Sequence, residues 1–433
     1  MKLPRMLPVR QDFPDRRLEN IEHEVTRELA GSGLAERLKP GSRIAIGVGS
    51  RGIANIDTIA RSVAAFWKSC GMRPFIIPVM GSHGAATAAG QADVLAHYGI
   101  TEQTMGCPIV SSLDVVSLGK TPAGIETFID KQAYESDGVM LVSRIKWHTD
   151  FEAPIESGLF KMMAIGLGKL AGAQRYHTHA YNMGLLSMIH SVGRQVLQSG
   201  RILGGLAILE DAYHQTAQLT AVCAEDFERR EKELLALVKS WKGRILLDEI
   251  DVLIVDEIGK NISGAGMDTK IVNRGSNGRY NPWPNAPKIQ RIFVRDLSPF
   301  TYGNAIGFGL ADVVTTRLVE GIDWESTRVN ALTASALAAV RTPLHSRSDR
   351  ECIHVLAQAV GKLNTEDVTF AWIRNSLELG QLVVSENLLP KIEAHPQMEV
   401  TGPASEFEFD AEGNLADRLP KTIGAAATVP SLS

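Results

Sequence analysis

The sequence has few cysteines, and none of them are paired in a motif. Only four occur in 433 residues, they are widely spaced, and no two form a C-x-x-C pattern. A disulfide framework or a structural zinc site needs closely patterned cysteines, so neither is expected. We predict that the four side chains are reduced, partly buried thiols: Cys70, Cys107, Cys223 and Cys352.

Long apolar runs and a strong net charge are also missing. No stretch reaches the roughly 18 uninterrupted apolar residues of a membrane span, and the N-terminal MKLPRMLPVRQDFPDRR lacks the apolar centre of a signal peptide. The net charge of -4 gives no general attraction for nucleic acid or an anionic membrane. These absences favour a soluble cytoplasmic protein that binds neither nucleic acid nor membrane.

The chain contains enough apolar material for more than one domain. It is 44% hydrophobic and 22% charged over its 433 residues, which suffices for two or more substantial cores. We predict two α/β domains at residues 1–245 and 246–433. A long amphipathic helix at 225–241 closes the first, and the apolar strand and glycine-rich loop within 249–270 open the second.

Apolar strands and helices alternate near the start of the first domain, over residues 43–49, 56–70, 74–80 and 87–98. This order predicts a doubly wound, largely parallel sheet, in which ligands bind beyond the carboxyl ends of the strands. Arg51 and His83 fall at two such ends, and a later core strand ends just before His148. The three residues are therefore candidates for one site.

Residues 47–52 have the sequence G-V-G-S-R-G and satisfy the G-x-G-x-x-G pattern. A dinucleotide site also needs an acidic residue near the end of the second strand, and PFIIPVMGSHG offers none. A tight strand-to-helix turn and a bound phosphate or carboxylate remain alternatives, and an NAD site is the weakest of the three.

Residues 144–179 combine a lysine and several histidines with small, apolar and glycine-rich neighbours. A lysine such as Lys161 in apolar surroundings loses charge or reacts, since a buried ammonium is costly, and such lysines serve as nucleophiles or covalent anchors. Histidines supply neutral nitrogen donors for metal ligation and proton transfer. His177 and His179 face the same way if this part is extended and diverge if it is helical.

These motifs together resemble the lactate racemase family, whose members use a nickel pincer nucleotide. In that family a histidine lies about ten residues before a lysine in a glycine-rich turn, and another histidine follows sixteen residues after the lysine. In this chain His148 precedes Lys161 by thirteen residues, and His177 follows Lys161 by sixteen. The G-S-H-G at 81–84 resembles the family's G-x-H motif, and Arg51 resembles the arginine of its D-x-[ST]-R motif. The similarity covers roughly residues 40–180, with a looser likeness to about residue 390.

The resemblance implies a cofactor and a reaction. The cofactor is pyridinium-3,5-bisthiocarboxylic acid mononucleotide nickel, with Lys161 joined to one sulfur arm as a thioamide and His177 as the protein's nickel ligand. Soft sulfur, carbon and imidazole donors suit Ni(II). A 2-hydroxy acid would dock its carboxylate on Arg51, and His83 and His148 would exchange the hydroxyl proton on opposite faces while hydride moves to the cofactor and back. The implied enzyme is an isomerase, a 2-hydroxy acid racemase or epimerase.

Further assignments follow from the resemblance. Ser50, next to Arg51, is assigned to the cofactor, and a lysine of the second domain is expected in the same interdomain cleft, where we choose Lys260 over Lys270. Domain closure would exclude water from the hydride step. The expected partners are the small 2-hydroxy acid and the enzymes that make the cofactor, and assembly into a homo-oligomer is left open.

The chain also departs from the family pattern. Val48 stands where the family has an acid, residues 157–161 read S-G-L-F-K instead of S-G-G-x-K, and the Pro-Gly after the lysine survives only as Gly166. These changes predict a divergent branch whose substrate is a larger hydroxy acid or a sugar acid.

Three other functions are weighed against the racemase. One is an NAD-linked oxidoreductase using the glycine-rich loop, and another is a non-catalytic binding homologue of the family. The third is a metal-dependent hydrolase built on His177 and His179, which would need more carboxylate ligands than this segment provides.

Overall fold

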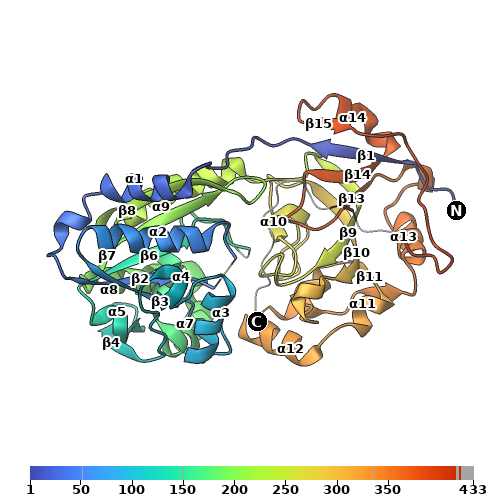
Figure 1. The fold of residues 1–433 in the computed structure, drawn as a ribbon. Helices are drawn as coiled ribbons and strands as arrows, with labels where there is room; N and C mark the ends of the chain where they lie inside the picture. Colours follow the sequence, from blue (N-terminus) through green and yellow to red (C-terminus); the bar gives the residue numbers. More distant parts are fainter. Residues whose placement is uncertain (51, 150, 335, 416–418, 421–433) are drawn as a thin grey trace. The chain divides into compact units, whose positions relative to one another are not determined.

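Two large β-sheets organise the chain, one in each of two units (Figure 1). The structure is a computed structural model that describes residues 1–50, 52–149, 151–334, 336–415 and 419–420. The N-terminal unit spans Arg16–Lys242, and the C-terminal unit comprises Met1–Asp15 and the described residues from Gly243 onward. The predicted α/β class is confirmed. The predicted interdomain cleft stays a prediction.

The N-terminal unit is built on a five-stranded sheet in the spatial order β3-β2-β6-β7-β8. The first four strands are parallel and β8 is antiparallel to β7, so the largely parallel sheet predicted from the sequence is confirmed. The strands are β2 (Arg43–Val48), β3 (Arg73–Pro78), β6 (Gly138–Arg144), β7 (Ile202–Glu210) and β8 (Thr216–Cys223). A separate hairpin joins β4 (Val115–Lys120) to β5 (Glu126–Asp130).

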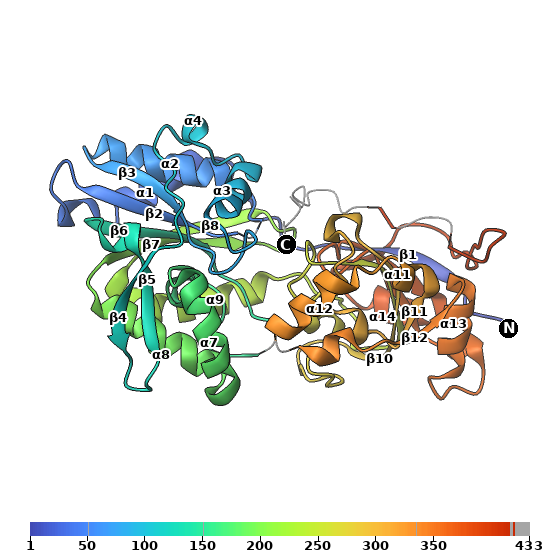
Figure 2. The ribbon, with the colours of Figure 1, turned by 90° about the horizontal axis from the view of Figure 1, so that it is seen from below.

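Helices cover both faces of this sheet, as expected of a doubly wound arrangement. Figure 2 shows α1 and α2 on one side and α7, α8 and α9 on the other. The helices are α1 (Ile21–Ala30), α2 (Ile56–Ser69), α3 (Ala88–His97), α4 (Glu102–Met105), α5 (Lys131–Tyr134), α6 (Leu159–Lys161), α7 (Lys169–Met183), α8 (Leu185–Gln198) and α9 (Phe227–Trp241). A π-helical turn, Met162–Gly166, separates α6 from α7.

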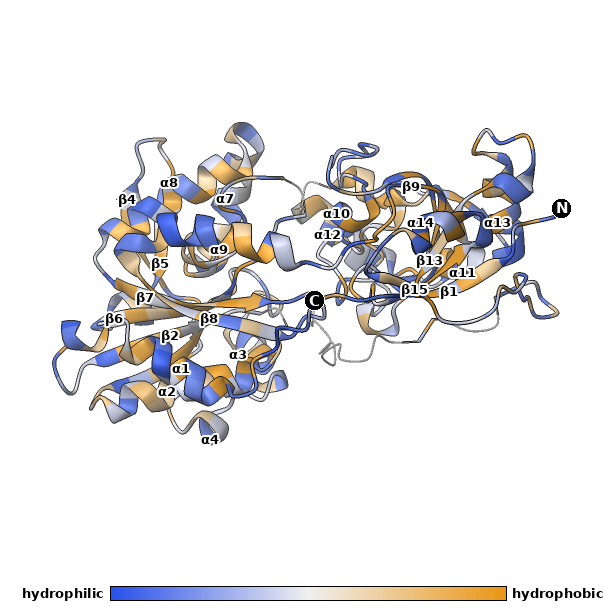
Figure 3. Ribbon diagram, turned by 90° about the horizontal axis from the view of Figure 1, so that it is seen from above, coloured by the Kyte–Doolittle hydropathy of each residue, from blue (hydrophilic) through white to orange (hydrophobic). Residues whose placement is uncertain are grey.

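The main core of this unit lies between the sheet and α6 to α9. Leu141 of β6 and Leu209 of β7 are fully buried there with Phe160 of α6, Val192 of α8 and Phe227 of α9. Figure 3 shows hydrophobic colour along the strands and alternating colours on α9, the pattern of a helix with one buried face. This packing fixes the position of the segment that carries Lys161.

The C-terminal unit contains an eight-stranded mixed sheet in the order β12-β11-β10-β9-β13-β14-β1-β15. Its first five strands are parallel, and β14, β1 and β15 continue it in antiparallel pairs. The strands are β1 (Met6–Gln11), β9 (Glu249–Ile258), β10 (Lys288–Leu297), β11 (Val313–Thr315), β12 (Leu344–Ser346), β13 (Phe370–Ile373), β14 (Gln381–Ser385) and β15 (Met398–Val400). The helices are α10 (Thr269–Val272), α11 (Thr316–Glu320), α12 (Trp324–Thr333), α13 (Asp349–Gln358) and α14 (Leu389–Glu393).

The N-terminal strand β1 belongs to this second sheet. It pairs with β14 from Met6 opposite Ser385 to Arg10 opposite Gln381, and its other edge pairs with β15. The domain boundaries expected from the sequence assign β1 to a first domain at residues 1–245. Its strand partners lie near residues 381–400.

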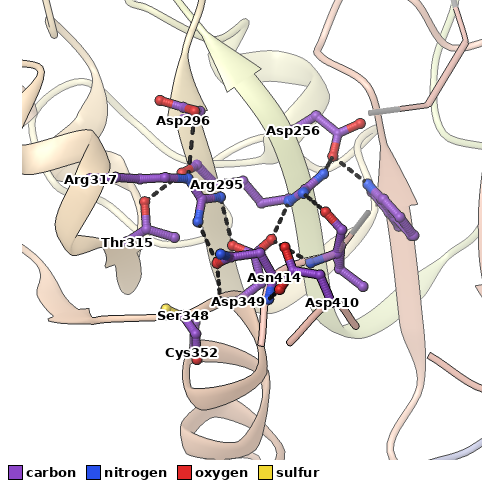
Figure 4. A network of polar contacts seen from close by, with 12 residues as sticks. Asp256, Arg295, Asp296, Thr315, Arg317, Ser348, Asp349, Cys352, Asp410 and Asn414 are labelled. Carbon is purple, nitrogen blue, oxygen red and sulfur yellow. Dashed lines mark hydrogen bonds and ion pairs between the residues drawn. The ribbon is translucent and has the colours of Figure 1, made fainter. Parts of the chain in front are cut away.

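A buried network of charges joins the carboxyl ends of β9 and β10 to the start of α13 (Figure 4). Arg295 donates to Asp256 at 2.6 Å, to Asp349 at 2.8 Å and to the carbonyl oxygen of Leu415 at 2.8 Å. Arg317 completes the network with a 2.7 Å bond to Asp349. Burial is the main influence on the Asp256 carboxyl and raises its pKa despite the neighbouring Arg295.

In the described part of the chain, no helix combines the length and the apolar character needed to cross a bilayer.

Candidate functional site

Three of the expected site residues lie on loops at the carboxyl edge of the N-terminal sheet. Val48, the last residue of β2, lies opposite Pro78 of β3 on one side and Val142 of β6 on the other. The loops that follow these three adjacent strands carry Ser50, His83 and His148 respectively. Since all three strands are parallel, their loops leave the sheet at the same edge. That Arg51, His83 and His148 form one site stays a prediction.

Ser50 and His83 are in direct contact. The Oγ of Ser50 hydrogen-bonds Nδ1 of His83, and Tyr98 donates from its hydroxyl to the carbonyl oxygen of Ser50 at 2.9 Å. His83 itself is exposed on the loop after β3. The hydroxyl of Ser50 therefore fixes one ring nitrogen of an exposed imidazole, which sets the orientation of the ring.

The His83 loop has a specific backbone shape. Gly84, Ala85 and Ala86 all have positive φ angles, of 66°, 52° and 54°, and this conformation is costly for alanine. A Cβ at Gly84 would lie 2.7 Å from the backbone nitrogen of Gln91, so only glycine fits there. The Gln91 side chain then donates to the carbonyl oxygens of Gly81, at 2.8 Å, and His83, at 3.2 Å.

A buried lysine supports this loop from below, and the sequence did not single it out. Lys169 is fully buried, and its Nζ lies 2.6 Å from the carbonyl oxygen of Pro78, 3.1 Å from Oε1 of Gln91 and 3.1 Å from Oδ2 of Asp130. Burial lowers the pKa of Lys169 although the carboxylate of Asp130 opposes the shift. The lysine ties the end of β3, the hairpin strand β5 and the His83 loop into one structure.

Lys161 differs from the expectation that it would be the lysine buried among apolar residues. It is half-buried at the end of the three-residue helix α6, whereas the fully buried lysine of this segment is Lys169. The contacts that bury Lys169 come from Pro78, Gln91 and Asp130, which are distant in sequence, so no local signal separates the two lysines.

A buried carboxyl group holds the start of α6. Glu231 of α9 accepts a hydrogen bond from the backbone nitrogen of Phe160 at 2.9 Å, and a Cβ on Gly158 would lie 2.6 Å from its Oε1. Burial raises the pKa of Glu231 to about 7, against backbone hydrogen bonds from Phe160 and Leu159 that lower it. This titrating group lies directly beneath the turn that presents Lys161.

His177 and His179 both lie in α7, so the extended alternative is wrong for this stretch. In a helix, residues two apart lie roughly 200° apart around the axis, so positions 177 and 179 fall on different faces of α7. The side chain of His177 lies outside the described residues, and His179 is half-buried. The helix removes the geometric basis for a metal site made by this pair alone.

His148 is a buried histidine on a loop organised by Glu156. Its ring stacks on Phe151 with centroids 4.4 Å apart, and its backbone nitrogen donates to Oε2 of Glu156 at 2.5 Å. Glu156 also accepts from Lys239 of α9 at 2.5 Å. The ring is thus held both by stacking and by a loop fastened to a neighbouring helix.

The remaining expected residues fall elsewhere. Arg51 lies outside the described residues. Lys260, in the C-terminal unit, contacts the carbonyl oxygen of Gly264 at 3.2 Å and Oδ1 of Asn330 at 3.1 Å. Lys270 is 6% exposed, with its Nζ 5.0 Å from the centre of the Trp283 ring. The choice between the two lysines stays a prediction.

The G-x-G-x-x-G turn has a packing explanation. A Cβ on Gly47 would lie 2.7 Å from Cγ2 of Val79 and 3.0 Å from Cδ2 of Leu141. A larger residue than glycine would therefore have to displace the side chains of Val79 and Leu141. The residues that follow β3, from Val79 to Gly84, include no carboxylate that could hold a ribose.

Comparison with known proteins finds similarity in structure but not in sequence. No family profile matches the chain, and no curated protein matches it by sequence. Its structure is similar to that of the lactate racemase apoprotein from Thermoanaerobacterium thermosaccharolyticum, with a TM-score of 0.49 and 13% sequence identity over 86% of this chain and 98% of that one.

Proposed function

We propose that the protein is a racemase or epimerase of a 2-hydroxy acid that works with a nickel pincer nucleotide. The observation that carries the proposal is the position of two imidazoles on either side of one strand. His83 follows β3 and His148 follows β6, and both strands flank β2, which delivers Ser50. Inverting a carbon that bears a hydroxyl requires a base on each face of the substrate, and two flanking histidines meet that requirement.

Each imidazole has its own support. Ser50 holds Nδ1 of His83, and Phe151 stacks on His148. A neutral imidazole takes the hydroxyl proton on one face and the protonated partner returns one on the other. We assign Arg51 to the substrate carboxylate, because a guanidinium binds a carboxylate through two parallel hydrogen bonds.

The proposal assigns two residues to the cofactor. A nucleotide that supplies most of the nickel donors itself would need only one protein imidazole, and His177 of α7 is assigned that role. Lys161, half-buried next to a π-helical turn, is assigned to anchor the nucleotide, and π turns are frequent at functional sites. When bound, the nucleotide would accept and return a hydride.

The proposal extends to the surroundings of the site. We assign Lys260 to the substrate from the C-terminal unit, and we place the enzyme in the cytoplasm with the enzymes that make its cofactor. The departures at Val48 and residues 157–161 favour a hydroxy acid larger than lactate.

The decisive experiment is co-expression with the cofactor-making enzymes, followed by intact-mass and metal analysis. We expect one nickel per chain and a mass increment that maps to the peptide containing Lys161. Lys169, eight residues further on, is the internal control, because its three buried contacts leave no room for attachment. A protein with neither nickel nor increment, or one whose melting temperature rises with NAD instead, contradicts the proposal.

Activity is tested separately with a panel of 2-hydroxy acids. We expect His83→Gln and His148→Gln to keep the nickel and the mass increment while the rate of racemisation falls roughly 100-fold or more, the usual effect of removing a general base. Loaded wild-type protein that racemises no member of the panel would favour the non-catalytic homologue.

A further inference from the structure

An arginine and a buried glutamate occupy the same carboxyl edge and have no role in the function proposed above. Arg144 is the last residue of β6 and Glu210 the last residue of β7, its neighbour. Nη1 of Arg144 donates to Oε2 of Glu210 at 2.7 Å. The Glu210 side chain is 2% exposed and that of Arg144 is 18% exposed. The buried partner thus holds a cation that reaches the surface.

Glu210 is fixed in its charged form. Burial is the largest influence and favours the neutral acid, but Arg144, His214 and Lys242 together hold the pKa of the carboxyl well below its usual range. The backbone nitrogen of Ala54, in the loop after β2, also donates to Oε1 at 3.4 Å. The carboxylate therefore connects Arg144 to the loop that carries Ser50.

The guanidinium uses only part of its hydrogen-bonding capacity. Arginine has five N–H donors, and in the described part of the chain Glu210 is the hydrogen-bond partner of Arg144, through one nitrogen. The ion pair of Arg37 with Glu225 is different, because both terminal nitrogens bind the carboxylate, at 3.0 and 2.7 Å. At Arg144 the second edge of the planar fork is left for another acceptor.

The position of Arg144 matches that of the site. Val48, the last residue of β2, lies opposite Val142 of β6, so Arg144, at the end of β6, lies at the carboxyl edge from which the Ser50 loop leaves β2. We propose that Arg144 binds an oxyanion of the ligand at this edge, with Glu210 as the residue that positions the guanidinium. The ligand group is a carboxylate or a phosphate, since both fit the arginine fork. The inference rests on the proposed function, which supplies the two anions to be tested. These are the carboxylate of a hydroxy acid and the phosphate of a pyridinium mononucleotide.

Calorimetric titration of the full-length protein without nickel nucleotide tests the inference. The probes are lactate, nicotinamide mononucleotide and nicotinamide riboside, which lacks the phosphate. The double variant Arg144→Gln/Glu210→Gln replaces the ion pair by two neutral amides, so neither of the two charges remains without the other. A bond to a charged group contributes about 1.5–3 kcal/mol, so we expect the dissociation constant to rise roughly 10- to 100-fold.

The pattern of loss identifies the anion. Weaker binding of lactate assigns Arg144 to the substrate carboxylate, and weaker binding of the mononucleotide with unchanged binding of the riboside assigns it to the phosphate. Arg144→Lys keeps the charge but not the fork and should show an intermediate loss. The control Arg37→Gln/Glu225→Gln should bind as wild type does.

Three results overturn the inference: wild-type protein that binds neither anionic probe, a double variant that binds like wild type, or a control that loses as much affinity. Melting temperatures confirm that each variant is folded. Nickel uptake is a separate measurement. A protein that binds the anion through Arg144 and takes up no nickel nucleotide would refute the proposed function while sustaining this inference.

Discussion

Glu231 gives the sharpest prediction, because its buried carboxyl group titrates near neutrality. Its pKa is raised from 4.5 to about 7 in the folded protein, chiefly by burial. The unfolded chain releases this proton near the ordinary value, so between pH 4.5 and 7 the folded state binds more protons. The contribution of Glu231 to stability is therefore complete below pH 4.5 and is lost as the pH rises through about 7.

The size of the effect follows from the shift. Moving a pKa from 4.5 to about 7 corresponds to about 3 kcal/mol, at 1.36 kcal/mol for each unit. Glu231→Gln keeps an acceptor for the backbone nitrogen of Phe160 and removes the titration. Between pH 5 and 8 we expect the free energy of unfolding of the wild type to fall by about 2–3 kcal/mol relative to that of the variant.

The measurement is urea unfolding at several pH values, with the difference between the two proteins as the result. The control is Glu228→Gln on the same helix. Burial is the largest influence on Glu228, but bonds to Lys232 and Arg194 outweigh it and lower its pKa, so this variant should not reproduce the effect. A pH-independent difference between wild type and Glu231→Gln, or one of opposite sign, would show that this carboxyl does not carry the expected proton.

Three other predictions concern the support of the His83 loop. Ser50→Ala should remove the hydroxyl that fixes Nδ1 of His83, and nitrogen NMR should then show a mixture of imidazole tautomers where the wild type shows one. Lys169→Met should leave the buried carboxylate of Asp130 without its cation and lower the free energy of unfolding by about 3–5 kcal/mol in urea titrations. Gly84→Ala should displace the loop, since the new Cβ meets backbone 2.7 Å away, and thermal unfolding should show a loss of more than about 1 kcal/mol.

Each of these variants has a matched control. Lys169→Met/Asp130→Asn removes both charges and should recover much of the stability. Gly99→Ala also places alanine at a positive φ, of 74°, but its nearest neighbour is 3.7 Å away, so it should cost less than Gly84→Ala. The spectrum of His97, which makes no contact with Ser50, should be unchanged in Ser50→Ala. If the double variant were as unstable as Lys169→Met, the unpaired carboxylate would not be the cause of the loss. If Gly99→Ala cost as much as Gly84→Ala, the close backbone contact at Gly84 would not be the cause.

The parts of the fold that depend on local pattern could be predicted from the sequence. Strands expected at 43–49 and 74–80 are β2 (Arg43–Val48) and β3 (Arg73–Pro78), and the helix expected at 56–70 is α2 (Ile56–Ser69). Apolar runs ended by glycine determine such elements with little help from the rest of the chain. The same alternation placed His83 and His148 after the ends of parallel strands, where the structure has them.

The parts of the fold that depend on contacts between distant residues could not be predicted from the sequence. The pairing of β1 with a strand more than 370 residues away is set by the second sheet as a whole, and nothing in MLPVRQ indicates its partner. Lys169 is buried because Pro78, Gln91 and Asp130 converge on it from three other elements. The residues next to Lys169 in the sequence do not indicate that it is buried. The small, apolar and glycine-rich residues around Lys161 predicted a buried lysine there instead.

The two sheets also differ in the contacts of an arginine at the carboxyl edge. Arg295 of the C-terminal unit binds two carboxylates and a carbonyl oxygen, through three different nitrogens. An arginine bound in this way has little capacity left for a ligand and serves to join strands (Figure 4). Arg144 of the N-terminal unit makes one such bond and is partly exposed. Ligand recognition by arginine is therefore expected at the edge that also carries Ser50 and His83, and charge reversal at Arg144 should impair binding where removal of Arg295 should impair folding.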